Sequence, residues 1–174
     1  EIGTIQPLEE VGRLAADRDI YLHTDAVQTA GKIDVDVDAM GVDLLSLSAH
    51  KLYGPKGVGA LYLRRGTKMQ SLATGGGHER GLRSGTENVA GIVGLARAAD
   101  LAREEMAAEG QRLSQLRDRL AALVLGRIKD AWVNGSMEKR LPGSLNFGFS
   151  YVEGESLLLY LDSKGIAVST GSAC

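Results

Sequence analysis

Apolar residues recur along the first half of the chain at two spacings, one typical of helices and one typical of strands. Segment 8–19, LEEVGRLAADRD, has helical spacing and follows Pro7, a residue favoured in the first turn of a helix. Segments 20–23 (IYLH), 42–49 (VDLLSLSA) and 57–65 (GVGALYLRR) are short and apolar, as strands are. Segment 42–49 is apolar on both faces, which predicts a central strand of a parallel sheet. This alternation of helix and strand predicts an α/β fold.

The second half of the chain begins with a long helical pattern and then changes in texture. Residues 89–129 predict one long helix or two in succession, with Ala and Leu on one side and a charged, solvated face on the other. The segments after it predict a strand at 132–136, a strand at 144–152, a helix at 153–165 and a strand at 166–174. Trp132, in the first of these strands, is expected to be a core residue. We therefore expect a domain boundary near residue 127. Residues 1–127 would be part of a large domain with its connecting helix, and residues 128–174 the first part of a smaller α/β domain.

Composition narrows the classes of function. The chain of 174 residues is 44% hydrophobic and 24% charged, with a net charge of −2, so the basic surface of a nucleic-acid-binding protein is not expected. Its longest apolar runs, such as LAALVLG, are far shorter than the ~20 residues that cross a bilayer, and EIGTIQP does not resemble a leader peptide. A single cysteine, Cys174, predicts a reducing compartment, by default the cytoplasm.

Three polar clusters follow apolar strands: HTDAVQ at 23–28, SAHK at 48–51 and STGSAC at 169–174. In open α/β sheets, ligands bind at the carboxyl ends of the strands. We therefore expect the three clusters to meet around one ligand.

The side chains in these clusters suit pyridoxal phosphate. A lysine that binds this cofactor must lose its proton, which burial or a cationic neighbour favours, and Lys51 follows a buried strand beside His50. The pyridine nitrogen needs a carboxylate, for which Asp25 is the candidate, and Gln28 is available for the ring hydroxyl. Hydroxyl and imidazole donors for the phosphate come from Ser48, His50 and Thr86. Taken singly, Asp25 would equally suit a helix cap and Lys51 a surface position.

The motifs HTDAVQTAGK, SLSAHKLYGPKGVGALYLRR, GGGHERGLRSGTENVAGIVGL and STGSAC, in this order, resemble the cysteine desulfurases of the NifS/IscS type. These enzymes belong to the class V aminotransferase group and have the fold type I of pyridoxal-phosphate enzymes, whose large domain is a three-layer α/β structure with a mostly parallel sheet. The resemblance covers essentially the whole chain.

The resemblance implies a role for each matching residue. Lys51 would bind the cofactor covalently, Asp25 would contact the pyridine nitrogen, and Gln28 would contact the ring hydroxyl. The segment Ser48–Ala49–His50 would hold the phosphate. Thr86 would reach the phosphate in the partner subunit of a homodimer. Cys174 would accept sulfur as a persulfide while L-cysteine becomes L-alanine.

The resemblance also implies partners and missing parts. The sulfur would pass to an iron–sulfur scaffold of the IscU or NifU type or to another acceptor. No permanent metal is expected, although Cys174 could bind an iron–sulfur cluster transiently. Family residues that contact the cofactor upstream, and an arginine downstream that binds substrate, have no counterpart here. We therefore expect this stretch to be a piece of a longer protein, which alone would bind the cofactor poorly and could be inactive.

Two alternatives remain at this point. A selenocysteine lyase or another pyridoxal-phosphate lyase of the same fold would use Lys51 equally but depend less on Cys174. A truncated, non-catalytic dimerisation or docking module would need neither residue. No role follows for His23, and His78 is expected to support the glycine-rich loop at 74–88.

Overall fold

The computed structural model describes residues 2–171, which divide into two compact units. We call Pro7–Ala108 the sheet unit, and the described residues before Pro7 and after Ala108 the hairpin unit. The division falls inside a long helix, whereas the sequence places the domain boundary near residue 127. The sequence pattern changes after the helix, which suggested that boundary. In the structure, the part of the helix from Glu109 onward belongs to the same compact unit as the residues that follow it. The domain boundary of the whole protein stays a prediction.

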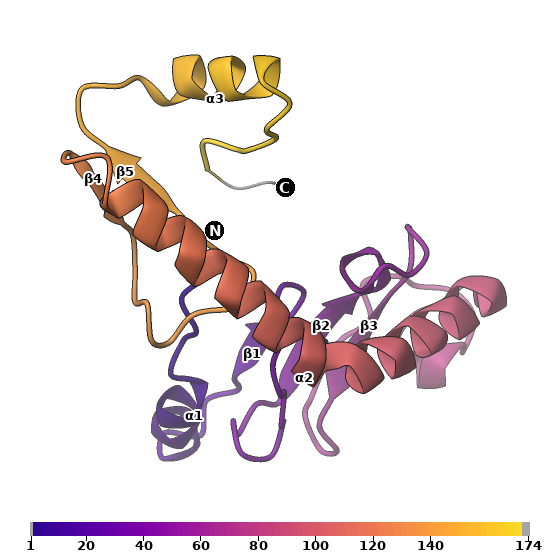
Figure 1. Cartoon of the computed structure of the whole chain (residues 1–174). Helices are drawn as coiled ribbons and strands as arrows, with labels where there is room; N and C mark the ends of the chain where they lie inside the picture. The colour runs from indigo at the N-terminus through magenta and orange to yellow at the C-terminus, as the bar shows by residue number, and fades with distance from the viewer. Residues whose placement is uncertain (1, 172–174) are drawn as a thin grey trace. The chain divides into compact units, whose positions relative to one another are not determined.

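The sheet unit contains three strands, β1 (His23–Asp25), β2 (Leu44–Ser48) and β3 (Gly59–Leu63), in the order β1-β2-β3 (Figure 1). β1 is parallel to β2, and β3 is antiparallel to it. The prediction that segment 42–49 supplies a central strand is confirmed. The described sheet is mixed because the short connection from β2 to β3 suits an antiparallel return, whereas the longer one from β1 to β2 allows a parallel crossover.

The core of this unit lies on one face of the sheet. Ala26, Val42 and Leu45 are at most 3% exposed. Partly buried apolar side chains surround them, namely Leu22, Val35, Val37, Met40, Leu47 and Tyr62. α1 (Leu8–Ala16), which confirms the helix predicted at 8–19, has its buried position at Gly12. A Cβ there would lie 2.1 Å from the carbonyl oxygen of Met40, so only glycine allows this approach.

The long helical pattern forms one continuous helix of 37 residues, α2 (Val89–Leu125). Exposed ion pairs such as Arg112–Glu109 lie along it, as expected for a solvated face. Among the described residues, no helix combines the length and the apolar character that a bilayer crossing requires.

The hairpin unit is named after two short antiparallel strands, β4 (Ala131–Val133) and β5 (Phe147–Phe149). Trp132 lies opposite Gly148, where a Cβ would come within 2.2 Å of the indole ring. The indole remains 48% exposed, and its N–H donates to Asn134 Oδ1 at 2.9 Å. The expectation that Trp132 is a core residue is therefore wrong, because Trp132 covers a backbone position at the surface.

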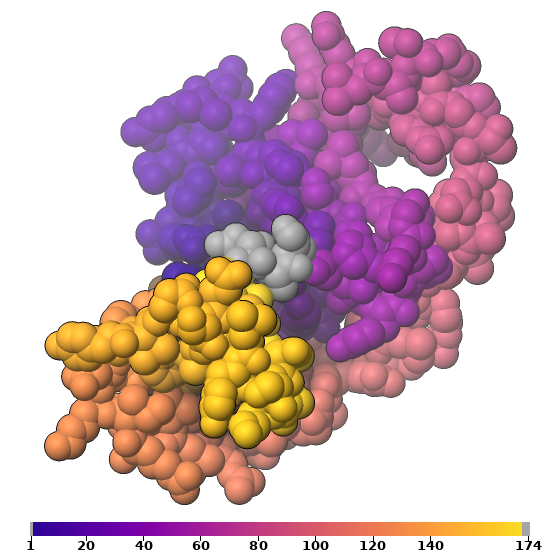
Figure 2. Space-filling model, turned by 90° about the horizontal axis from the view of Figure 1, so that it is seen from above, coloured from indigo at the N-terminus to yellow at the C-terminus, as the bar shows by residue number. Residues whose placement is uncertain are grey.

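After the hairpin comes α3 (Gly154–Ser163), which confirms the helix predicted at 153–165. The carboxylate of Glu153 caps it by accepting hydrogen bonds from the N–H groups of Glu155 and Ser156, at 2.9 and 2.6 Å. The described residues that follow, 164–171, are exposed (yellow in Figure 2) and form no strand. The strand predicted at 166–174 is therefore absent from its described part, since no neighbouring strand there shares a ladder of hydrogen bonds with it.

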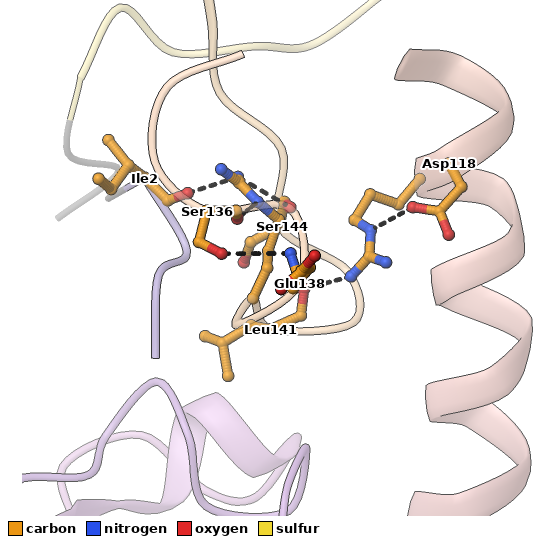
Figure 3. Close-up of polar contacts among 8 residues, drawn as sticks. Ile2, Asp118, Ser136, Glu138, Leu141 and Ser144 are labelled. Carbon is orange, nitrogen blue, oxygen red and sulfur yellow. Dashed lines mark hydrogen bonds and ion pairs between the residues drawn. The ribbon is translucent and has the colours of Figure 1, made fainter. Parts of the chain in front are cut away.

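A buried arginine organises the hairpin unit. Arg140 is 4% exposed, and its guanidinium donates hydrogen bonds to four backbone carbonyl oxygens, those of Ile2, Asn134, Ser136 and Ser144. Figure 3 shows Ile2, Ser136 and Ser144 around it. We call this arrangement the Arg140 clamp. The bond from Nε to Ser136 is 2.8 Å long and that from Nη1 to Ile2 is 2.5 Å long. The clamp thereby joins the first described residues to the loop between β4 and β5.

Arg117 of α2 lies in the same neighbourhood. It donates to the carbonyl oxygen of Leu141 at 3.2 Å and pairs with Asp118 at 2.8 Å (Figure 3). Burial, and then the positive charge of Arg117, lower the pKa of Arg140. Arg140 nevertheless stays charged, because arginine does not lose its proton in proteins.

Candidate functional site

The register of β1 and β2 gathers polar side chains on one face of the sheet. Asp25 is aligned with Ser46, so His23 and Asp25 share a face with Ser46 and Ser48, while Leu45 points to the core on the other face. His23 Nε2 lies 2.8 Å from Ser46 Oγ, which links the two strands through their side chains. The structure therefore brings together two of the three clusters that were predicted to meet.

Beyond β1, the chain turns tightly so that Asp25 and Gln28 lie close in the sequence and in space. Asp25 Oδ1 accepts the N–H of Val27 at 2.8 Å, a local bond that fixes the carboxylate at the strand end. Gln28 follows in the turn and is exposed. Its Oε1 accepts a hydrogen bond from Lys32 Nζ at 3.3 Å. The turn thus presents an acid and an amide at the carboxyl end of β1.

Beyond β2, the 3-10 helix η1 (Ala49–Leu52) carries His50 and the half-buried Lys51. Ser48 Oγ lies 2.7 Å from His50 Nδ1, so the hydroxyl and the imidazole are placed as a pair. Ala49 is fully buried, and its N–H donates to the carbonyl oxygen of Val58 at 3.0 Å. This bond anchors η1 to the backbone of Val58, and a contact of Ala49 with the cofactor stays a prediction.

The first half of α2 supports both turns through small residues spaced four apart. A Cβ at Gly94 would lie 2.5 Å from Pro55 Cγ, and Ala98 Cβ lies 3.0 Å from the Cβ position at Gly54. Ala102 lies one turn further on, 2.9 Å from the Cβ position at Gly31. Since only small side chains permit this approach, α2 holds the turns after β1 and β2 against a single surface.

The glycine-rich segment 74–88 is a loop with one short 3-10 helix, η2 (Glu79–Gly81). His78 Nδ1 accepts the N–H of Gly85 at 3.3 Å, the supporting contact expected of that histidine. Thr86 is exposed in this loop, and its carbonyl oxygen accepts from Arg83 Nη1 at 3.4 Å. Thr86 comes from a different segment than the β1–β2 edge, and its contact with a partner subunit stays a prediction.

Two further predictions concern Cys174 and the binding of metal ions. Cys174 lies outside the described residues, so the third cluster is represented by Ser169, Thr170 and Gly171 alone. Within residues 2–171, no group of three or more His, Cys, Asp or Glu side chains is arranged to hold a metal ion.

The structure also adds contacts that the sequence reasoning missed. The pair His23–Ser46 and the contact of Lys32 with Gln28 were not predicted. Both leave a signal in the sequence. His23 and Asp25 alternate at strand spacing, as do Ser46 and Ser48, and Gln28 and Lys32 are four residues apart, the spacing at which side chains of a helical turn meet.

Comparisons with known proteins identify relatives of this chain. The cysteine desulfurase IscS of Dictyoglomus turgidum is 59% identical over 174 residues, and the match covers all of this chain and 44% of that protein. The cysteine desulfurase IscS of Clostridium botulinum is 56% identical over 176 residues, again with all of this chain and 44% of the relative covered. The chain thus spans less than half the length of the curated relatives it matches.

A solved structure described as a NifS-like protein has a TM-score of 0.90 and 43% sequence identity, and the match covers 97% of this chain and 46% of the other. This likeness confirms the predicted α/β fold class, that of the fold type I pyridoxal-phosphate enzymes. Residues 1–174 match the family described as aminotransferase class-V, whose cysteine desulfurase members depend on pyridoxal phosphate. This chain therefore belongs to the class V aminotransferase family.

Proposed function

We propose that the protein containing this chain is a pyridoxal-phosphate-dependent cysteine desulfurase. It converts L-cysteine to L-alanine and carries the sulfur as a persulfide on Cys174, for iron–sulfur cluster or thio-cofactor assembly. The observation that supports this most is the meeting of Asp25, Gln28, Ser48 and His50 with the helix of Lys51 at the carboxyl ends of two parallel strands. The identity of 59% to a cysteine desulfurase named IscS supports the same reaction.

The chemistry of this donor set fits pyridoxal phosphate. A carboxylate, an amide, a hydroxyl–imidazole pair and an amine lie at one sheet edge, and each suits one polar group of the cofactor. Asp25 would hold a proton on the pyridine nitrogen, and Gln28 would bind the ring oxygen. The segment Ser48–Ala49–His50 would bind the phosphate, together with Thr86 of a second subunit. When bound, pyridoxal phosphate supplies an electron sink for the charge that develops on the substrate carbon.

The residues of the chain have separate tasks in the reaction. Lys51, as a free amine, would accept the Cα proton of the substrate as a general base. Cys174 attacks the sulfur of L-cysteine as a thiolate. An S–S bond forms as the C–S bond breaks, and the electron pair stays on the three-carbon fragment, which takes up protons to become L-alanine.

The proposal also covers the oligomeric state of the protein, its location in the cell and its partner. We infer that the protein acts as a homodimer, because the resemblance implies that Thr86 reaches the phosphate in the partner subunit. We also infer a cytoplasmic location, since a single cysteine suits a reducing compartment. It passes sulfur to an iron–sulfur scaffold of the IscU or NifU type or to another acceptor protein.

The test uses the whole protein purified with pyridoxal phosphate. We expect a visible absorbance band, covalent attachment of the cofactor to Lys51 after borohydride reduction, and L-alanine formation from L-cysteine. Lys51→Ala should abolish attachment and activity. Cys174→Ala should keep the band and lose sulfur release.

Other outcomes would contradict the proposal. If Cys174→Ala kept most of its activity on selenocysteine, the protein would be a selenocysteine lyase. A whole protein that bound no cofactor would be a non-catalytic module.

A further inference from the structure

Lys32 contacts the turn that presents Gln28. Lys32 Nζ donates to Gln28 Oε1 at 3.3 Å. The turn is wound like a helix here, since the N–H of Ala30 bonds to the carbonyl oxygen of Ala26 at 2.9 Å and that of Ile33 to Thr29 at 3.2 Å. Residues four apart in such a turn lie on one side of it, so the contact follows from the backbone.

This contact fixes which end of the Gln28 amide faces away from Lys32. An ammonium group has only donors, so it faces the amide oxygen and never the amide nitrogen. The other end of the amide, Nε2, then points away from Lys32 and can act as a hydrogen-bond donor. A ring oxygen that accepts a hydrogen bond needs such a donor.

Lys32 also lies beside the helix that carries Lys51. Gly31 has φ +71°, and a Cβ there would lie 2.6 Å from Leu52 Cδ2, the side chain next to Lys51. Because glycine allows this close approach, the following residue, Lys32, comes near η1. Burial, and then the positive charge of Lys51, lower the pKa of Lys32, in agreement with this position. Lys32 thus lies between the turn of Gln28 and the helix of Lys51.

We propose that Lys32 is a positioning residue of the cofactor site, whose ammonium group orients the Gln28 amide so that Nε2 donates to the ring oxygen of pyridoxal phosphate. This inference rests on the proposed function. It assigns to Lys32 no contact with the substrate or the reacting atoms, since Lys32 acts through Gln28.

The experiment compares Lys32→Met with Lys32→Arg in the whole protein. Lys32→Met should raise the Kd of pyridoxal phosphate about tenfold, the effect of one charge-assisted hydrogen bond. It should also shift the maximum of the visible band, which responds to hydrogen bonding at the ring oxygen. Lys32→Arg keeps a cationic donor, so its Kd and its band maximum should stay near those of the wild type. Lys68→Met, which removes an exposed lysine from the same unit, is the matched control and should leave both unchanged.

A double-mutant cycle with Gln28→Ala separates positioning from general support of the fold. In the Gln28→Ala background, Lys32→Met should change neither the Kd nor the band further. An effect that persists in that background, or a lowered melting temperature without a spectral shift, would overturn the inference. If Lys32→Met does not fold, Lys32→Gln should shift the band in the same direction, and an unshifted band overturns the inference. A wild-type protein without a visible band would instead overturn the proposed function and the inference with it.

Discussion

The two units each remove a cationic side chain from water, but they satisfy it in different ways. Arg140 in the hairpin unit is 4% exposed and donates to four backbone carbonyl oxygens. Lys32 in the sheet unit is half-buried and donates to a side-chain amide. A cation bound by carbonyls fixes the path of the chain, whereas a cation bound by a side chain fixes the direction of that side chain. The comparison separates a residue that maintains the fold from one that prepares a site.

The largest effect is expected on activity, when Asp25 of the sheet unit is replaced by asparagine. Asp25→Asn can still accept the N–H of Val27 through its amide oxygen, so the turn should survive. It removes the negative charge that we propose lies opposite the pyridine nitrogen, an attraction of about 4 kcal/mol at 4 Å and an effective dielectric of 20. We expect the rate of L-alanine formation in the whole protein to fall roughly a thousandfold.

The control for Asp25→Asn is the melting temperature, which should stay near that of the wild type. Full activity in this variant would show that the carboxylate has no part in the reaction. A collapse of the fold would place Asp25 with Arg140 as a structural residue.

The next effect concerns the Arg140 clamp. Arg140→Met leaves four backbone carbonyl oxygens without their donor, which should lower the free energy of unfolding by about 3 kcal/mol or more. Urea unfolding of the whole protein measures this. Arg119→Met, which removes an exposed arginine from α2, is the control and should change stability little.

The visible spectrum of the same Arg140→Met variant tests whether the hairpin unit affects the cofactor site of the sheet unit. The clamp should act on the fold alone, so the visible band of the bound cofactor should keep its maximum at temperatures where the protein is folded. A shifted band would mean that the two units do not divide their tasks as proposed.

The smallest effect compares two glycines of the same helix. Gly94 faces Pro55 Cγ, which a Cβ would approach to 2.5 Å, while a Cβ at Gly110 would lie 3.7 Å from Pro142 Cγ, an ordinary contact. Gly94→Ala should therefore destabilise the protein by about 1–2 kcal/mol through overpacking against the turn after η1. Gly110→Ala should stabilise it by up to about 1 kcal/mol, because alanine favours the helix. Thermal unfolding of the two variants measures the difference, and effects of equal sign would contradict the packing of α2 against that turn.

Local patterns predicted much of the sheet unit. The run VDLLSLSA is apolar on both faces and became the central strand β2, and the helical spacing after Pro7 became α1. The acid at the end of β1, the amide after it and the lysine after β2 could be located because polar residues at the carboxyl ends of strands collect at one edge of the sheet. These features depend on residues close together in the sequence.

The hairpin unit was predicted less well. Trp132 reads as a core residue but is 48% exposed, and segment 166–171 reads as part of a strand but has no ladder in the described chain. Whether an apolar residue is buried, or an extended segment pairs, depends on distant partners that periodicity does not identify.

The order of apolar and polar residues by itself determined the helices α1, α2 and α3 and the strands β2 and β3, whereas the strand predicted at 20–23 overlaps β1 only at His23. The sequence motifs indicated the family to which the chain belongs. Only the tertiary structure decided that Arg140 would be buried among carbonyl groups and that Lys32, which contacts Gln28 within its own turn, would also come near Lys51. The physical reason is that a charged side chain in a sequence looks solvated until the fold brings acceptors around it. Burial then turns the same charge into a structural or a positioning contact.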